Sequence, residues 1–199
     1  MSTVASATDH PSTRTASARD RLLAAADELF YAEGVHSVGI DRVIERAGVA
    51  KASLYNAFGS KDELVKAYLI KRRQARQERI TRGIERYDTP REKLLAVFDV
   101  VGEAIAEPTY RGCAFMNASA ESRRGGSVEE VCDATRAWVR GLFRDLAAAA
   151  GASDPDDVAA QCVVLYDGAA VGAQMDRSRS SALVARAMAE TLLDAAIRH

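Results

Sequence analysis

Apolar residues recur at every third or fourth position along most of this 199-residue chain, and no stretch alternates apolar with polar residues as a strand would. A helix of about 3.6 residues per turn places such residues on one face. The four prolines, Pro11, Pro90, Pro108 and Pro155, all lie outside the periodic stretches and would interrupt none of them. The sequence therefore predicts an all-α fold of about nine helices.

Capping signals mark where several helices begin. A serine, threonine or aspartate at the N-cap accepts a hydrogen bond from the first turn, and an acidic residue three positions later favours the same start. The pairs are Ser17 with Asp20, Ser60 with Glu63, Thr89 with Glu92, Ser127 with Glu130, and Asp154 with Asp157. They predict a first helix that ends at Gly34, a long helix from Ser60 to about Tyr87, and final helices near 155–175 and 181–198.

The charges divide the chain into unlike halves. Residues 1–87 carry 15 Lys and Arg against 11 Asp and Glu, whereas residues 88–199 carry 12 against 17. The overall net charge of −1 therefore hides a positive N-terminal half, which suits a nucleic-acid partner better than the average does. Different partners are expected for the two halves.

Several classes of protein are disfavoured. The longest nearly uncharged stretch, residues 161–175, falls short of the roughly 20 apolar residues that cross a bilayer, so no membrane partner is expected. Residues 1–17 lack the apolar core of a secretory signal and predict a disordered tail on a cytoplasmic protein. The three cysteines, Cys113, Cys132 and Cys162, have no spacing typical of a disulfide framework or a zinc site, and neither a metal nor a cofactor is expected.

Residues 40–58 predict a helix-turn-helix unit, with two short helices joined at Gly48. The second helix begins at Lys51 and exposes the small side chains of Ala52 and Ser53, where a merely soluble helix would expose long charged ones. A small outer face allows close approach to a flat partner. Helix-turn-helix units use their second helix in this way, inside the major groove of DNA.

The segment GVHSVGIDRVIERAGVAKASLYNAFGSKDELVKAYL, Gly34 to Leu69, resembles the DNA-binding region of TetR-family transcriptional regulators. Its most specific pieces are Ala47-Gly48-Val49, Leu54-Tyr55, Phe58 and Ser60-Lys61. Two positions depart from the family pattern. Val38-Gly39 stands where a Thr/Ser pair is usual, and Ala50 replaces a common serine, so two hydroxyls that cap helices or contact phosphates are missing.

The resemblance implies residues 18–60 as the DNA-binding domain and residues 61–199 as a ligand-binding and dimerisation domain. Tyr55 would contact a phosphate or a thymine methyl, and Lys61 would bind a phosphate at the positive end of its helix. The implied DNA-contacting set is Lys51, Ala52, Ser53, Tyr55, Asn56 and Lys61. The alternative for each is an ordinary packed or solvated side chain.

The second half carries no catalytic motif, and its large apolar side chains could line a ligand cavity or simply form a core. The cavity candidates are Phe98, Cys113, Phe115, Met116, Asn117, Trp138, Leu142 and Tyr166. The stretch RGCAFMNASA, residues 111–120, is similar to a segment that lies near the pocket in the family. Cys113 itself is either an inert buried thiol or a redox-sensing one.

The last two predicted helices are rich in small residues, which let helix axes approach closely. The resemblance implies that they pair with their copies in a homodimer, as a palindromic operator requires. The candidate interface residues are Gly168, Gly172, Ala185 and Met188. Intramolecular packing is the alternative.

The long helix predicted from Ser60 carries an arginine-rich face between Arg72 and Arg86. This face is more typical of a solvated or pocket-rim surface than of a second DNA-binding surface.

The function expected from the resemblance is a ligand-responsive repressor that binds a palindromic operator on double-stranded DNA as a homodimer and is released by a small-molecule inducer. An activator and a ligand-independent DNA-binding protein are the alternatives. A helical enzyme is disfavoured, because His10, His36 and His199 lie in the tail, in an early loop and at the C-terminus, away from the candidate cavity.

Overall fold

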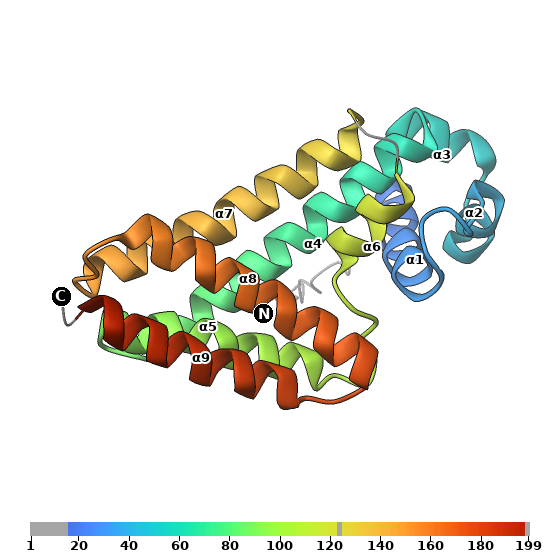
Figure 1. The fold of residues 1–199 in the computed structure, drawn as a ribbon. Coiled ribbons are helices and arrows are strands. Elements are labelled where there is room, and N and C mark those ends of the chain that lie inside the picture. The colour runs from blue at the N-terminus through green and yellow to red at the C-terminus, as the bar shows by residue number, and fades with distance from the viewer. Residues whose placement is uncertain (1–15, 123–124, 198–199) are drawn as a thin grey trace, which may run out of the picture.

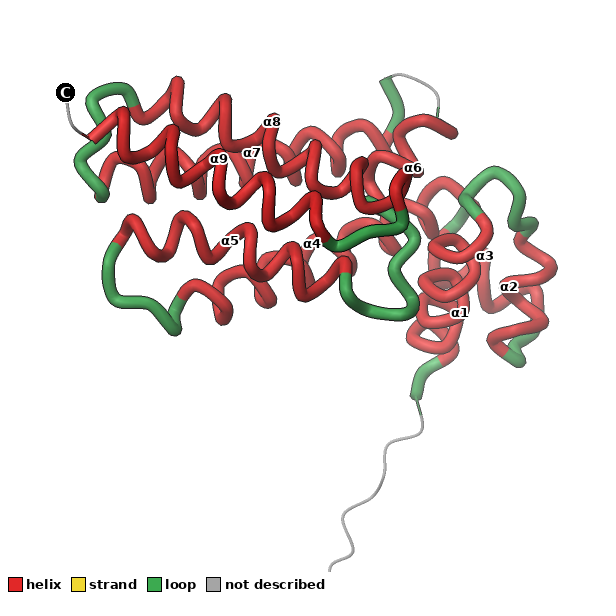
Figure 2. The backbone as a smooth tube through the Cα atoms, turned by 60° about the horizontal axis from the view of Figure 1, so that its bottom comes forward, coloured by secondary structure: helices red, strands yellow, loops and turns green. Residues whose placement is uncertain are grey.

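The structure, a computed structural model, describes residues 16–122 and 125–197, and these residues form nine α-helices. The helices are α1 (Ala18–Glu33), α2 (Ile40–Ala47), α3 (Lys51–Phe58), α4 (Lys61–Ile84), α5 (Pro90–Ile105), α6 (Ala114–Glu121), α7 (Ser127–Ala149), α8 (Pro155–Asp176) and α9 (Ser180–Ile197). Everything described between them is loop or turn (Figure 2). The all-α prediction is confirmed. Of the predicted disordered tail, residues 1–17, residues 1–15 lie outside the described residues, and Ser17 is instead the N-cap of α1.

The capping signals identify most helix starts. The side chains of Ser17, Ser60 and Asp154 each accept a hydrogen bond from the backbone N–H three residues on. Thr89 and Glu92 form the complete reciprocal capping box. The predicted start at Ser127 is wrong by one residue, because extended Gly126 is the N-cap and Ser127 is the first helical residue.

The helices form a small head and a larger bundle that share α4 (Figure 1). Helices α1, α2 and α3 make the head at one end, and α4 runs from the head into the bundle of α5, α7, α8 and α9. Helix α6 lies beside the head, although it follows α5 in sequence. The C-terminal end of α9 lies at the far end of the bundle from the head.

Two hydrophobic cores correspond to this division. The bundle core includes Phe98, Phe143 and Leu193, all fully buried. The head core contains Leu22 and Leu54, but it also continues through the first half of α4 into α6 and the start of α7. The head therefore packs against α6 and the start of the bundle helix α7 through its own core, which is separate from that of the bundle.

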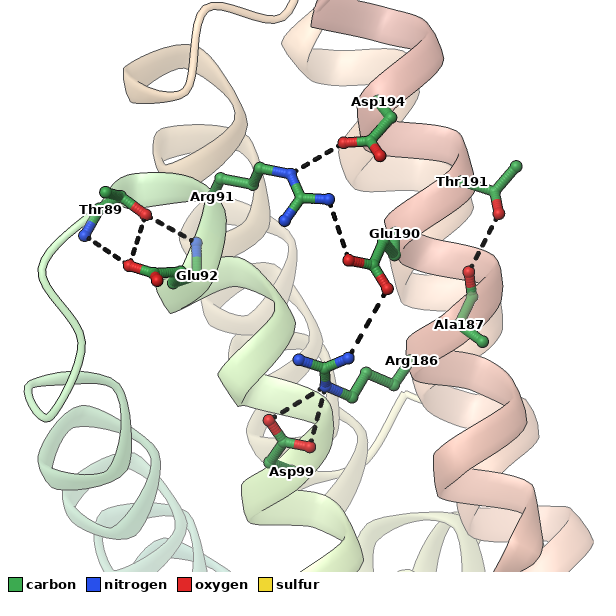
Figure 3. A network of polar contacts seen from close by, with 9 residues as sticks. All are labelled: Thr89, Arg91, Glu92, Asp99, Arg186, Ala187, Glu190, Thr191 and Asp194. Atoms are coloured by element: carbon green, nitrogen blue, oxygen red, sulfur yellow. Dashed lines mark hydrogen bonds and ion pairs between the residues drawn. The ribbon is translucent and has the colours of Figure 1, made fainter.

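Ion pairs hold α5 against α9 on the surface of the bundle (Figure 3). Arg91 contacts both Asp194, at 2.8 Å, and Glu190, at 2.9 Å. Arg186 lies 3.0 Å from Asp99 and 3.7 Å from Glu190. The network links α9 to a helix that packs directly on α4.

No helix within the described ranges is long and apolar enough to span a membrane.

Candidate nucleic-acid interface and adjoining cavity

The turn between α2 and α3 has the geometry predicted from Gly48. This residue adopts the left-handed conformation, φ 62° and ψ 44°, and its N–H donates to the Glu45 carbonyl oxygen at 3.1 Å. Three residues then suffice to start α3, whose inner side is held by fully buried Leu54. The two short helices thus form a helix-turn-helix with α3 as the second, outward-facing helix.

Ion pairs fix α2 against its neighbours. Arg42 pairs with Glu33 at 2.6 Å and Arg46 with Glu28 at 2.7 Å, which joins α2 to α1. Lys51, at the start of α3, lies 2.9 Å from Asp41. The hydrogen bond that Lys51 donates to the Asp41 carboxylate raises the pKa of Lys51. Such exposed pairs contribute little stability, so Lys51 can exchange Asp41 for a phosphate at small cost.

The residues predicted to contact DNA gather on one end of the head. Lys51, Ala52, Tyr55 and Asn56 are exposed, while Ser53 and Lys61 are half-buried. Tyr55 keeps 46 % of its surface exposed, which is unusual for an aromatic side chain. Lys61 is the first residue of α4, directly after α3, and forms no ion pair with any described residue. All six residues therefore keep exposed surface, on α3 or at the start of α4.

The two missing hydroxyls leave α2 and α3 without side-chain caps. Gly39 and Ala50 are the N-caps, both extended, and neither makes a capping hydrogen bond through a side chain. Because serine caps a helix better than alanine, we expect Ala50→Ser to raise the free energy of unfolding by about 1 kcal/mol. Chemical denaturation checks this. Ala52→Ser, inside α3, is the matched control, and equal stability of the two variants would contradict the prediction.

A cavity of about 540 Å³ lies where the head meets the bundle. Residues of α1, α4, α5, α6 and α8 line it, together with the loop between α5 and α6. Its volume is within the range of small-molecule sites in proteins. The stretch 111–116, the first part of RGCAFMNASA, contributes one continuous wall of this cavity.

Half of the predicted cavity residues line this cavity, namely Cys113, Phe115, Met116 and Tyr166. The other half does not. Phe98 is buried in the bundle core, with its ring centroid 5.5 Å from that of Phe143, and Trp138 and Leu142 pack against the same core. The Asn117 side chain donates to the Arg111 carbonyl oxygen at 3.1 Å and closes the loop before α6. These four side chains pack in the bundle core or close the loop, and they do not line this cavity.

Tyr31 of α1 connects the head to the cavity wall, a role that the sequence did not reveal. Its hydroxyl donates to the Gly112 carbonyl oxygen at 3.0 Å and accepts from the Arg111 N–H at 2.9 Å. The Arg72 guanidinium lies 3.7 Å from the centroid of the Tyr31 ring. Gly112 is required here, because it has φ 89° and a Cβ at this position would overlap the side chain of Gln174.

The outer surface of α8 and α9 is apolar. Six of the eight large hydrophobic side chains that are exposed in the described chain lie on these two helices: Val164, Val171, Met175, Leu183, Val184 and Met188. Of the predicted interface residues, Gly168 and Met188 are exposed. Ala185 is buried in the bundle core, and a Cβ on Gly172 would meet Ser181 of α9, so both serve packing within the chain.

Comparison with known proteins identifies the family. A sequence model of the bacterial regulatory proteins of the tetR family matches residues 22–68. A TetR-family transcriptional regulator from Streptomyces coelicolor has 32 % sequence identity and a TM-score of 0.85, over 90 % of this chain and 96 % of that chain. This chain belongs to the TetR family of transcriptional regulators. TetR-family proteins are DNA-binding regulators and not enzymes, which confirms that expectation.

Two further relatives bear on the assignment. A proposed TetR regulator from Streptomyces avermitilis has 34 % identity and a TM-score of 0.80, over 91 % of this chain and 98 % of that chain. The HTH-type transcriptional activator FasR from Mycolicibacterium smegmatis is 49 % identical over 51 residues, 26 % of this chain. The matched part spans only 23 % of the length of FasR.

Proposed function

We propose that this TetR-family chain is a homodimeric, cytoplasmic repressor. It binds a palindromic operator and releases it when a small molecule enters the cavity where the head meets the bundle. The observation that carries the proposal is the double role of Phe115. Its ring lines the cavity, and the same side chain is buried in the core of the head. A ligand that displaces Phe115 therefore disturbs the packing of the head core.

Release of the operator requires a change in the spacing of two heads. In a dimer, the two α3 helices must enter the major groove one helical turn apart, roughly 34–36 Å. A ligand shifts this equilibrium only if it binds the wrongly spaced conformer better, typically by about 1–3 kcal/mol. Helix α4 suits this coupling, because it carries Lys61 at its start and lines the cavity further along with Arg72, Arg76 and Ile80.

The exposed apolar face of α8 and α9 supports the homodimer. Val164 and Met188 line one shallow groove between the two helices, so apolar side chains from both belong to a continuous surface. A large exposed apolar patch on a soluble domain typically marks an interface. A second copy of the same surface fits it, since a twofold axis places identical patches against each other.

Activation is the second candidate, and the match to FasR favours it. FasR is described as an activator, and the match covers about a quarter of this chain. Whether the protein represses or activates depends on where the operator lies relative to the promoter. In vitro transcription from a template that carries an operator selected from genomic DNA, with and without the protein, distinguishes the two functions. Repression lowers the transcript level and activation raises it.

Lys61→Met tests the proposed DNA contact. We expect operator affinity to fall about tenfold and the salt dependence of binding to weaken by about two phosphate contacts per dimer, because each copy loses one. Fluorescence anisotropy with an operator selected from genomic DNA measures both. Lys93→Met, on α5 of the bundle, is the matched control and should bind like the wild type. An unchanged salt slope for Lys61→Met would contradict the contact.

A further inference from the structure

Arg76 differs from the two arginines that flank it on the same face of α4. Arg72 pairs with Asp27 at 2.6 Å, and Arg79 pairs with Glu107 at 2.9 Å. Arg76 lines the same cavity but forms no ion pair with any residue that the structure describes. Its Nη2 atom lies 3.5 Å from the Cys113 Sγ atom, and its guanidinium lies 4.6 Å from the centroid of the Phe115 ring.

Each acidic residue of the cavity wall forms an ion pair with an arginine other than Arg76. Their ion pairs are Asp27 with Arg72 at 2.6 Å, Glu28 with Arg46 at 2.7 Å, Glu107 with Arg79 at 2.9 Å, and Asp167 with Arg136 at 2.5 Å. The phenols nearest to Arg76 are uncharged, because burial raises the pKa of Tyr166 and of Tyr110. Within the described chain, no carboxylate neutralises Arg76.

Arg76 nevertheless keeps its charge. Burial opposes the charged form, but the pKa of Arg76 stays above its ordinary value, and a guanidinium is protonated at neutral pH in any case. Arg76 is half-buried, and a partly buried charge without a counter-charge is unfavourable. A guanidinium is the protein group best shaped to bind a carboxylate through two parallel hydrogen bonds. We propose that Arg76 is the anchor for an anionic ligand, and that the cavity binds a small organic acid by its carboxylate.

The rest of the wall defines the body of this acid. Two of the tyrosine hydroxyls are already used, since Tyr31 bonds Gly112 and Tyr110 donates to the Ala170 carbonyl oxygen at 3.2 Å. The Tyr166 hydroxyl adjoins Arg76 and can donate to the same carboxylate. Much of the remaining wall is apolar, including Ile105, Phe115 and Met116. One anionic group on an apolar body of less than about 540 Å³ fits this arrangement.

The inference rests on the proposed role of the cavity as the ligand site, and matched acids and amides test it. The full-length protein is titrated by calorimetry with benzoate, salicylate, 4-phenylbutyrate and decanoate, and with the neutral amide of each. We expect the acids of this panel to bind about 10- to 100-fold more tightly than their amides, because only the acids make charged hydrogen bonds. No preference for any acid across the panel would overturn the proposal.

Three variants locate the anchor. Arg76→Met should abolish the preference for acids, whereas Arg79→Met, which removes a paired arginine from the same wall, should retain it. Cys113→Ser should also retain it, because the thiol supplies no charge to the ligand. Persistence of the preference in Arg76→Met, or its loss in Arg79→Met alone, would overturn the assignment of Arg76.

Thermal unfolding without ligand separates an anchor from a structural arginine. An anchor that lacks a counter-charge should leave the melting temperature of Arg76→Met equal to or above that of the wild type. A lower melting temperature would show that Arg76 is part of the structural framework and would overturn the proposal. Operator binding without ligand is measured in parallel: its failure in the wild type would contradict the proposed regulator and not the anion site.

Discussion

Replacing Met188 with glutamate should convert the proposed dimer into a monomer and lower the affinity for a palindromic operator by more than about a hundredfold. Met188 is 54 % exposed on α9 and lines the apolar groove between α8 and α9. Glutamate at this position would leave an unpaired carboxylate in the interface of each copy, and each such burial costs about 3–5 kcal/mol. The fold of the single chain should survive, because the side chain is exposed in it.

Analytical ultracentrifugation measures the dimer, and anisotropy with the operator measures the loss of DNA binding. Ala148→Glu, which adds the same charge on an exposed position of α7, is the matched control and should remain dimeric. Circular dichroism confirms that both variants keep their helices. A Met188→Glu protein that is still dimeric at micromolar concentration would place the interface elsewhere and remove the basis for the twofold arrangement of heads.

Local signals in the sequence determine much of the helical framework. A cap acts within one turn, so Ser17, Thr89 and Asp154 each identify a helix start without any knowledge of the fold. The error at Ser127 has the same local origin. Gly126 adopts the extended conformation that an N-cap needs, and the serine then continues into the helix.

The cavity could be predicted only in part, because its wall and the core use the same residue types. Helical periodicity separates the buried face of a helix from the exposed one, but it does not distinguish a face that packs from a face that borders a cavity. Phe98 and Phe115 are equally apolar and almost equally buried, yet only Phe115 lines the cavity. The difference is set by contacts between helices that are distant in sequence.

The sequence contained a signal for the role of Arg76, but the run of arginines around this residue obscured that signal. The positions three and four residues away on the helix are Arg72, Arg73, Arg79 and Ile80, so no acidic residue can pair with Arg76 along the helix. The sequence favoured a solvated or pocket-rim face for this whole stretch. The structure divides it, since Arg72 and Arg79 are paired while Arg76 lines the cavity without a carboxylate partner in the described chain.

Tyr31→Phe should weaken the link between ligand and head while leaving both binding sites intact. The Tyr31 hydroxyl is the hydrogen-bonded bridge from α1 to Arg111 and Gly112. Its removal takes a partner from the N–H of one and the carbonyl of the other, which should lower the free energy of unfolding by about 1–3 kcal/mol. Hydrogen exchange at the Arg111 amide should accelerate, because its N–H loses the acceptor. The ratio of operator affinities without and with a bound acid should fall several-fold, because a coupling of about 1–3 kcal/mol depends on such contacts.

Tyr110→Phe is the matched control for this coupling. This substitution also removes a hydroxyl from the cavity wall. In the wild type, however, the Tyr110 hydroxyl donates to the Ala170 carbonyl oxygen of α8, inside the bundle, and makes no bond to the head. We therefore expect a similar loss of stability from Tyr110→Phe without a comparable loss of coupling. If both variants reduce operator release equally, general loosening of the cavity would explain the effect. If Tyr31→Phe retains full release, the signal must reach the head through Phe115 and α4, and the hydrogen-bonded bridge would be structural only.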